Sequence, residues 1–501
     1  MRSRRRRAGL DHLAGAFDSR LSQSVVIGEF VANELYERHC GGCGDFDMPP
    51  YLALTLTLGF LAVSLWADSE ASSRLSRAAW PPFIWMLICA SRSLSDWLDA
   101  SAPNQDFLSA SLQGNVIDQA FLALLVALVA PTLWKRRGAV AEILGRNKTI
   151  CVFFVYLGIS TIWSDISLIS LRRWFRLLAG LLMVIVILTE RNPYEAAATL
   201  VRRSAYLLVP LSLLCIKYFP DFGVWYTKYG EQIVAGVTLE KNTLGHLTCV
   251  SALFLFWSLI TFRGVGLPTT RTWRWIIDWV VLIASVYLLI VSKSSTSLAA
   301  LFVGVFVCLL VRFQVIRSNI RSIGILALIA IFVFAVLEML FGIVGIVIEM
   351  LGRDTTVTGR APLWALLVDL GLQRPVLGYG YGGFWTGERF DIVYDAFKLT
   401  IHIGHNGYLE TFVEAGFVGL FLLVLVIVAA FNTIKQVLLL DFDYGVLCLA
   451  LFIMILLCNV TESSFAKPQD YLWFVFLLIS VGIPVSAAGS RVRAATKLSR
   501  S

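Results

Sequence analysis

The stretch that decides the fold is residues 411–431, TFVEAGFVGLFLLVLVIVAAF, in which Glu414 is the only charged side chain. About 20 mostly apolar residues are the length that an α-helix needs to cross a bilayer. Because similar runs recur along almost the whole chain, the sequence predicts an all-α, polytopic transmembrane helix bundle of about 12 spans. The other runs are residues 51–66, 79–90, 115–134, 149–163, 174–189, 204–219, 245–262, 275–292, 298–313, 322–351, 443–459 and 470–486.

The composition excludes an ordinary soluble protein. Of the 501 residues, 57% are hydrophobic and 15% are charged, whereas soluble domains carry about 25% charged residues. The net charge of +8 fits cationic loops that face anionic lipid, and no long basic stretch interleaves with aromatic residues, so we expect no nucleic-acid partner. Cys40 and Cys43 form a lone C-x-x-C pair that could be half a zinc site or a redox pair. Since no second pair lies nearby, a plain turn is favoured and no metal is expected.

Lys and Arg residues in short loops indicate the orientation, because such loops face the cytoplasm. This criterion predicts a multi-pass protein of the cytoplasmic (inner) membrane with the long polar segment 352–404 outside. The predicted organisation is a polar N-terminal tail at 1–48, transmembrane helices at 49–351, an extracytoplasmic loop holding part of the active site at 352–404, three last transmembrane helices at 405–486 and a basic cytoplasmic tail at 487–501. The residues that indicate the cytoplasmic side are Lys135, Arg136, Arg137, Arg146, Lys148, Arg191, Arg202, Arg203, Arg263, Arg271, Arg274, Arg312, Arg317, Arg321, Arg491, Arg493, Lys497 and Arg500.

Several basic residues lie on the outer side, against this bias. Charges placed in this way near the membrane are candidates for function, and their shared sign predicts an anionic ligand, since Arg and Lys bind phosphate groups. Anchoring to lipid head groups is the alternative explanation. The residues are Arg172, Arg173, Arg176, Lys241, Lys293, Arg353, Arg360 and Arg374.

Four short motifs lie near these cations. They are TLEKNTLGH at 238–246, TGRAPLW at 358–364, PVLGYGYG at 375–382 and HNGYLE at 405–410. In this order, and with the Ser-rich turn at 292–297, they resemble the O-antigen ligase and polysaccharide polymerase superfamily. The likeness is greatest to its exopolysaccharide-production branch, and it covers residues 50–485.

The resemblance implies a metal-independent, cofactor-free, inverting glycosyltransferase whose donor is an oligosaccharide on a polyprenyl pyrophosphate. An acceptor hydroxyl on a second glycan attacks the anomeric carbon, and the lipid pyrophosphate leaves. By resemblance, His405 is the catalytic base and Arg360 is catalytic and binds the pyrophosphate. Further pyrophosphate-binding candidates are Lys241, Arg172, Arg173 and Lys293. Other polysaccharide assembly and export proteins are the expected protein partners.

Alternatives remain at the levels of function and residue. The leading function is a polymerase that joins lipid-linked repeat units into an exopolysaccharide or O-antigen-type chain. A ligase that transfers the glycan to lipid A core or protein would use the same chemistry, and a transporter or flippase is a third option. Arg360 could instead pair with Asp354 or Glu388, His405 could only cap the loop, and His246 could be structural. The Asp441-Phe442-Asp443 motif is interpreted as loop solvation.

Overall fold

The chain is a bundle of membrane-length helices. In the computed structural model, the described residues are 48–71, 75–98, 115–226, 230, 232–261, 269–319 and 360–482. Seven helices in this part of the chain are long and apolar enough to cross a membrane, or eight if one bent pair counts as a span. The protein is therefore a polytopic helical membrane protein. The expected number of about 12 spans stays a prediction, because the run at 322–351 and the tails at either end lie outside the described residues.

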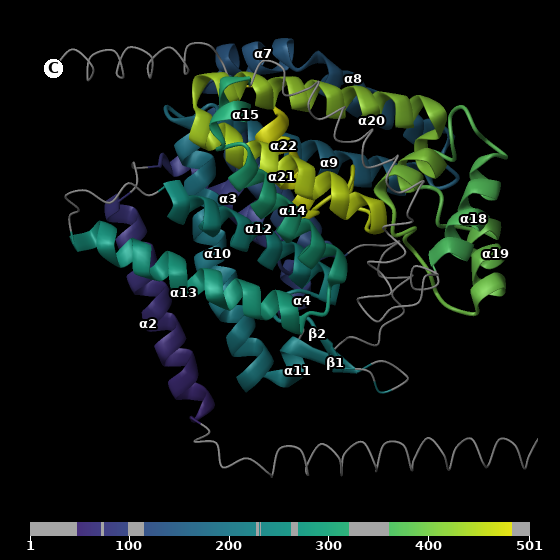
Figure 1. Cartoon of the computed structure of the whole chain (residues 1–501). Coiled ribbons are helices and arrows are strands. Elements are labelled where there is room, and N and C mark those ends of the chain that lie inside the picture. Colours follow the sequence, from purple (N-terminus) through teal and green to yellow (C-terminus); the bar gives the residue numbers. More distant parts are fainter. Residues whose placement is uncertain are drawn as a thin grey trace, which may run out of the picture.

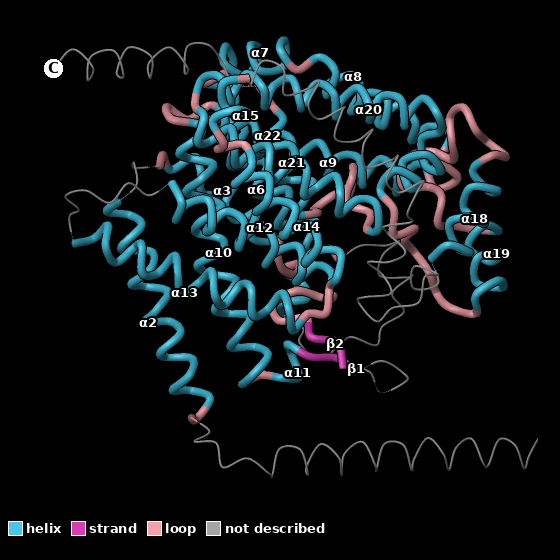
Figure 2. Tube along the Cα trace, viewed as in Figure 1, coloured by secondary structure: helices cyan, strands magenta, loops and turns pink. Residues whose placement is uncertain are grey.

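Figures 1 and 2 show the elements of the described chain, and those that end before residue 224 are all helical. They are α2 (Pro50–Ala71), the 3-10 turn η1 (Arg77–Ala79), α3 (Trp80–Cys89), α4 (Leu94–Leu98), α6 (Val116–Lys135), α7 (Arg137–Arg146), α8 (Lys148–Ser160), the 3-10 turn η2 (Thr161–Trp163), α9 (Ser167–Leu188), α10 (Pro193–Tyr218) and α11 (Pro220–Gly223).

The described chain after residue 223 adds one small hairpin and further helices. They are β1 (Val224–Tyr226), β2 (Gln232–Val234), α12 (Lys241–Thr261), α13 (Thr269–Val291), α14 (Ser295–Leu310), α15 (Gln314–Ser318), α18 (Arg360–Gly371), α19 (Glu388–Phe397), α20 (Gly407–Leu440), α21 (Phe442–Thr461) and α22 (Tyr471–Ser480). The antiparallel β1–β2 pair is a departure from the purely α-helical prediction.

The core lies around α12 and α21. These two are the most deeply buried of the candidate spans, whereas α2 and α6 keep most of their surface exposed. The most extensive packing joins α12 to α13, α14 to α21 and α20 to α21. Exposed apolar side chains on α2 and α6 are expected of helices that face lipid rather than water. The segments α18 and α19 lie together at one end of the bundle, and α15 lies at the opposite end (Figure 1).

Two helices begin earlier than the apolar pattern predicts. The helix α9 starts at Ser167 and α10 at Pro193, although their predicted apolar runs start at 174 and 204. The intervening turns carry arginines, which a hydropathy pattern assigns to loops. The structure keeps Arg202 within α10 because two carboxylates, Asp68 of α2 and Asp278 of α13, lie 3.6 and 3.8 Å from its guanidinium.

The helix α20 is broken near its start. Gly416 has φ +66° and ψ −168°, a backbone conformation that only glycine adopts readily. The turn of the PVLGYGYG motif fills the break, since Phe417 N donates to Pro375 O at 2.7 Å and Tyr379 N donates to Val413 O at 3.1 Å. A Cβ on Gly378 would lie 2.6 Å from the Glu414 carbonyl group. The glycines of the motif therefore allow a loop to enter a helix.

The loop before α12 is held by a single buried arginine. Arg92 donates from Nε to Thr238 O at 3.0 Å and from Nη2 to Gly236 O at 3.2 Å. Its guanidinium also lies 3.9 Å from the ring centroid of Phe222. These contacts fix the β1–β2 hairpin and with it the first turn of α12, where the TLEKNTLGH motif lies.

Candidate functional site

Four separate parts of the chain meet at one carboxylate, that of Glu462. This residue follows α21, and its Oε1 accepts hydrogen bonds from Arg360 Nη2 at 3.0 Å and from Asn242 Nδ2 at 2.8 Å. Its Oε2 lies 3.2 Å from His405 Nδ1. Only 9% of the Glu462 side chain is exposed. We call Glu462, Arg360, His405 and Asn242 the Glu462 cluster.

The backbone fixes His405 beside Glu462. His405 has φ +47°, a left-handed conformation that is uncommon for a residue other than glycine. The next residues pair with the loop after α21, since Asn406 N donates to Ser463 Oγ at 2.9 Å and Gly407 N donates to Glu462 O at 3.0 Å. A side chain at 407 would collide with Asn459 Oδ1. The HNGYLE motif thus contains the glycine that lets the two segments approach.

Arg360, the first described residue of α18, is held at the same corner. Its Nη1 donates to the carbonyl oxygen of Thr461, in addition to the bond with Glu462. The hydroxyl of Thr461 lies 2.6 Å from that of Thr296, so the Ser-rich turn at 292–297 reaches this corner too. Lys293 is an exposed residue of that turn with φ +53°. Arg360 does not use Glu388, the predicted alternative partner, and Asp354 lies outside the described residues.

The charges around Glu462 favour its ionised form. Burial raises the pKa of the Glu462 carboxyl, but the hydrogen bond from His405 and the positive charge of Arg360 outweigh burial, so that the pKa lies below its ordinary value. The opposite holds for Glu240, which still reaches solvent. Burial among the neighbouring loops raises the pKa of Glu240, and the negative charge of Glu462 adds to the rise although His405 opposes it.

A second cluster of polar residues is formed by the beginning of α20 and the loop after α21, close in sequence to His405 and Glu462. Lys467 Nζ is 2.7 Å from Glu410 Oε1 and 3.7 Å from Glu414 Oε1. The buried Glu410 also accepts from Trp385 Nε1 at 2.7 Å and from Gly404 N at 2.8 Å. We call these residues the Lys467 cluster. Trp385 and Gly404 belong to the outer segment, Lys467 follows α21, and Glu410 and Glu414 belong to the beginning of α20. The Lys467 cluster therefore joins these three parts of the chain.

The structure separates the predicted pyrophosphate ligands. Arg173 of α9 donates to Gly382 O at 2.6 Å, and its charge acts on Glu414 and Lys467, so it lies beside the Lys467 cluster. Arg172 is its exposed neighbour on α9. Lys241 is the first residue of α12, directly before Asn242. Only Arg360 and His405 of the predicted residues are members of the Glu462 cluster.

Sequence reasoning missed Glu462 and Asn242. Asn242 lies within the TLEKNTLGH motif, but its side chain is uncharged, and the charge that predicts a ligand there belongs to its neighbour Lys241. Glu462 stands at the outer end of an apolar run, in the sequence Thr461-Glu462-Ser463-Ser464. An acid at that position, on the side where the unexpected cations lie, is the signal that could have identified it.

The structure corrects the interpretation of the Asp441-Phe442-Asp443 motif and places His246. Some of the other predicted residues lie outside its described part. Asp441 and Asp443 do not merely solvate a loop, because Asp441 Oδ1 accepts from Tyr444 N at 3.2 Å and caps α21, and Asp443 lies 3.3 Å from Arg312 Nη2. His246 is buried in α12, and its Nε2 makes no hydrogen bond within the described residues. Arg353, the Cys40–Cys43 pair and the tail at 1–47 lie outside the described part of the chain.

The fold and the site define a multi-pass membrane protein with a histidine, an arginine and a carboxylate at one end of the bundle. Residues 280–424 match the family described as O-Antigen ligase, and this range contains Arg360 and His405. The chain is also 26% identical over 289 residues to the exopolysaccharide production protein ExoQ of Rhizobium meliloti (strain 1021). That match covers 56% of this chain and 64% of ExoQ. These matches confirm the predicted relationship to O-antigen ligases and ExoQ-like proteins.

Proposed function

We propose that the protein is a glycosyltransferase that polymerises polyprenyl-pyrophosphate-linked repeat units into an exopolysaccharide or O-antigen-type chain. The observation that carries the proposal is the convergence of Arg360 and His405 on Glu462. The two residues were predicted from motifs 45 positions apart in the sequence, and they share one carboxylate in the structure. The match to O-antigen ligases and to ExoQ supports the same chemistry.

His405 would act as the general base. With Nδ1–H directed at Glu462, its Nε2 is the proton acceptor, and Glu462 would stabilise the imidazolium that forms, as a carboxylate does in other histidine-based sites. The acceptor hydroxyl loses its proton to Nε2 while its oxygen bonds to the anomeric carbon. The bond from that carbon to the pyrophosphate oxygen breaks, and its electron pair leaves with the lipid pyrophosphate. A single displacement of this kind inverts the anomeric configuration.

Arg360 would stabilise the leaving group. Its bonds to Thr461 O and Glu462 leave further N–H donors of the guanidinium, which has five in all. Fixed cations close to a developing negative charge are effective in a site of low dielectric constant. Lys241, Lys293, Arg172 and Arg173 remain proposed as further contacts of the pyrophosphate or of adjacent phosphate-bearing lipid. In this proposal the site faces the periplasm or exterior of the inner membrane, and no metal is needed because the cations replace it.

Complementation with sized polysaccharide tests the proposal. The gene is deleted from its host and restored as wild type, Arg360→Ala or His405→Ala at matched protein levels, and the surface polysaccharide is separated on a gel. We expect wild type to give long chains and both variants to give mainly single repeat units, because loss of a general base costs about 10²–10⁴ in rate.

Lys398→Ala is the matched control for these variants, because Lys398 is exposed on the same outer segment and pairs only locally with Asp395 at 2.9 Å. It should restore long chains. Long chains that persist in both site variants but stay unattached there would instead identify the ligase. Unchanged polysaccharide in both site variants would reject the proposed roles and favour the transporter.

A further inference from the structure

The lipid-facing surfaces of two neighbouring helices end at the turn that fills the break in α20. The helix α8 packs against α20, and Tyr156 Oη of α8 donates to Ala415 O at 2.7 Å, directly before the break. Figure 1 shows the two helices side by side, with α18 and α19 at one end of the bundle. Their exposed apolar side chains recur at the spacing of one helical face, as expected of helices that face lipid. These side chains, each at least 47% exposed, are Val152, Val155 and Ile159 on α8, Ile162 on η2, and Phe417, Phe421, Val424 and Val428 on α20.

The turn after α18 continues this surface into the outer segment, residues 360–404. Leu372, Val376 and Leu377 are 53%, 58% and 46% exposed. Val418 N of α20 donates to Val376 O at 3.2 Å. The indole Nε1 of Trp163 donates to Leu377 O at 3.3 Å, so the turn lies against α20 and against η2, which follows α8. We call the exposed apolar side chains at this junction the outer apolar patch, and its residues are Ile162, Leu372, Val376, Leu377 and Phe417.

The helix α19 of the same outer segment carries a charged surface instead. Glu388, Asp391 and Asp395 are exposed, and so is Lys398 directly after the helix. Adjoining exposed apolar side chains mark a contact with a membrane or another apolar surface, whereas exposed charged side chains mark a contact with water. The outer segment therefore combines a charged helix with an apolar turn, and only the apolar turn adjoins the two lipid-facing helices.

Arg374 lies within the apolar turn. Its side chain is exposed, and its guanidinium lies 4.9 Å from the ring centroid of Tyr379 but forms no ion pair with a described residue. A basic side chain next to apolar ones is typical of segments that lie at the level of phospholipid phosphates. The nearby Trp163 fits the same level, because tryptophan is enriched where a membrane meets water.

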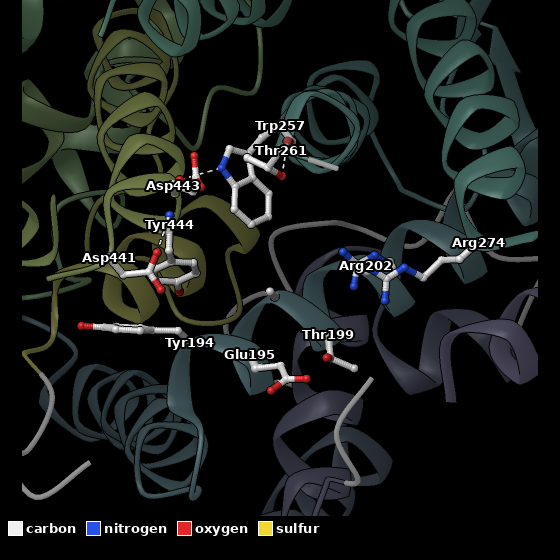
Figure 3. Close-up of a pocket in the computed structure, with 11 residues that line it drawn as sticks. Tyr194, Glu195, Thr199, Arg202, Trp257, Thr261, Arg274, Asp441, Asp443 and Tyr444 are labelled. Carbon is white, nitrogen blue, oxygen red and sulfur yellow. Dashed lines mark hydrogen bonds between the residues drawn. The ribbon is translucent and has the colours of Figure 1, made fainter. Parts of the chain in front are cut away.

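The arginines of the polar pocket in Figure 3 show the opposite arrangement. This pocket has a volume of about 320 Å³ and lies at the beginning of α21. Arg202 lies 3.6 Å from Asp68 and 3.8 Å from Asp278, and Arg274 also interacts within the chain. Their charges are compensated by the protein itself, whereas Arg374 keeps its charge at the surface, where lipid phosphate can reach it.

We propose that the outer apolar patch is inserted into the membrane leaflet on the side of the Glu462 cluster, where its side chains contact the acyl chains of phospholipids and Arg374 meets their phosphate groups. Residues 372–377 are then a lipid-bound turn and not part of a water-exposed loop, as the polar composition of 352–404 predicts. The part of α20 after the break, residues 417–440, extends about 36 Å, and the hydrocarbon core of a bilayer is about 30 Å thick. The break and the turn that fills it therefore fit the edge of that core.

Electron paramagnetic resonance of spin-labelled protein in phospholipid nanodiscs tests this proposal. Single labels are attached to Leu372→Cys, Val376→Cys or Phe421→Cys in the full chain. Three cysteines are first replaced with serine, because the other six are buried; they are Cys40, Cys43 and Cys151. Power saturation gives the ratio of the collision rate with oxygen, which concentrates in the bilayer, to that with a water-soluble nickel chelate. We expect this ratio to exceed unity at 372 and 376, as it does for a label at 421 on the lipid-facing side of α20.

Tyr394→Cys is the matched control, because Tyr394 is 44% exposed but lies on the charged helix α19. Its ratio should lie below unity. A ratio below unity at both 372 and 376 would overturn the proposal by placing the turn in water. Low collision rates with both reagents would overturn it too, because the patch would then be covered by protein, such as a second copy of the chain.

Elution as a single species and an unfolding temperature equal to that of the unlabelled chain show which labelled variants are folded. Two patch positions are labelled so that the result does not depend on one of them. Because the Glu462 cluster is not altered, these outcomes are independent of the proposed glycosyl transfer.

Discussion

At the scale of single residues, Glu462 joins a histidine, an arginine and an asparagine that come from different segments. Its removal would affect both the position of His405 and the stability of the loop. We expect Glu462→Gln to lower polymer formation less than His405→Ala does, because the amide keeps one acceptor but cannot stabilise an imidazolium. Glu462 is a positioning residue in this scheme, so the acceptor concentration needed for half-maximal rate should stay near that of wild type while the maximal rate falls. A fall in apparent acceptor affinity alone would contradict this role.

The lowered pKa of Glu462 gives a prediction for stability against pH. A carboxyl whose pKa is lower in the folded protein stabilises the fold above the ordinary pKa, which is about 4.3 for glutamate, and that stabilisation is lost as the pH falls through the lowered value. Glu462→Gln should therefore unfold more easily than wild type at pH 7, by about 1–3 kcal/mol for the donors left poorly paired. The difference should vanish only below about pH 4. Thermal unfolding in detergent across this range measures it, and a difference that disappears already near pH 6 would assign it to another group.

At the scale of elements, the break in α20 gives a sharp test. Gly416→Ala would place a Cβ against the Val376 carbonyl in a backbone conformation that alanine disfavours, at a cost of about 1–3 kcal/mol for the strain alone. We expect a lower yield of monodisperse protein and a lower unfolding temperature. Gly59→Ala in α2 is the control, because a Cβ there meets no atom within 4 Å and helical alanine is favoured over glycine. Equal yields and equal unfolding temperatures of the two variants would mean that the turn at 375–378 does not pack into the break in α20.

The elements also show what the sequence could predict. The apolar runs at 79–90, 115–134 and 443–459 correspond closely to α3, α6 and α21, because these helices carry few charges. The pattern failed where charges are buried in pairs, as at Arg202 with Asp68 and Asp278. The motifs identified Arg360 and His405, but no local pattern reveals that Glu462 lies between them. That contact depends on the packing of α12, α18 and α21, which are far apart in the sequence.

At the scale of the whole molecule, Asp441 and Glu462 mark opposite ends of α21, and the basic loops predict that the Asp441 end faces the cytoplasm. Accessibility to a membrane-impermeant maleimide in intact cells tests that orientation. Lys398→Cys, in the outer segment, should be labelled directly, whereas Lys148→Cys should be labelled only after the membrane is permeabilised. Wild type is the background control, since six of its described cysteines, Cys89, Cys215, Cys249, Cys308, Cys448 and Cys458, are buried. The reverse pattern would place the Glu462 cluster in the cytoplasm and exclude a periplasmic reaction.

The seating of residues 375–378 in the gap of α20 also limits how this chain can be recombined with its relatives. Phe417 and Val418 donate to the carbonyl groups of Pro375 and Val376, so neither segment keeps its backbone bonds if the other is replaced by one of different length. A chimera that exchanges only the outer loop would combine a loop and a helix whose backbone hydrogen bonds do not match. A chimera that exchanges residues 360–440 together would keep both partners of these bonds. Loop and helix form one structural unit, and experiments that exchange segments between this chain and its relatives should transfer that unit whole.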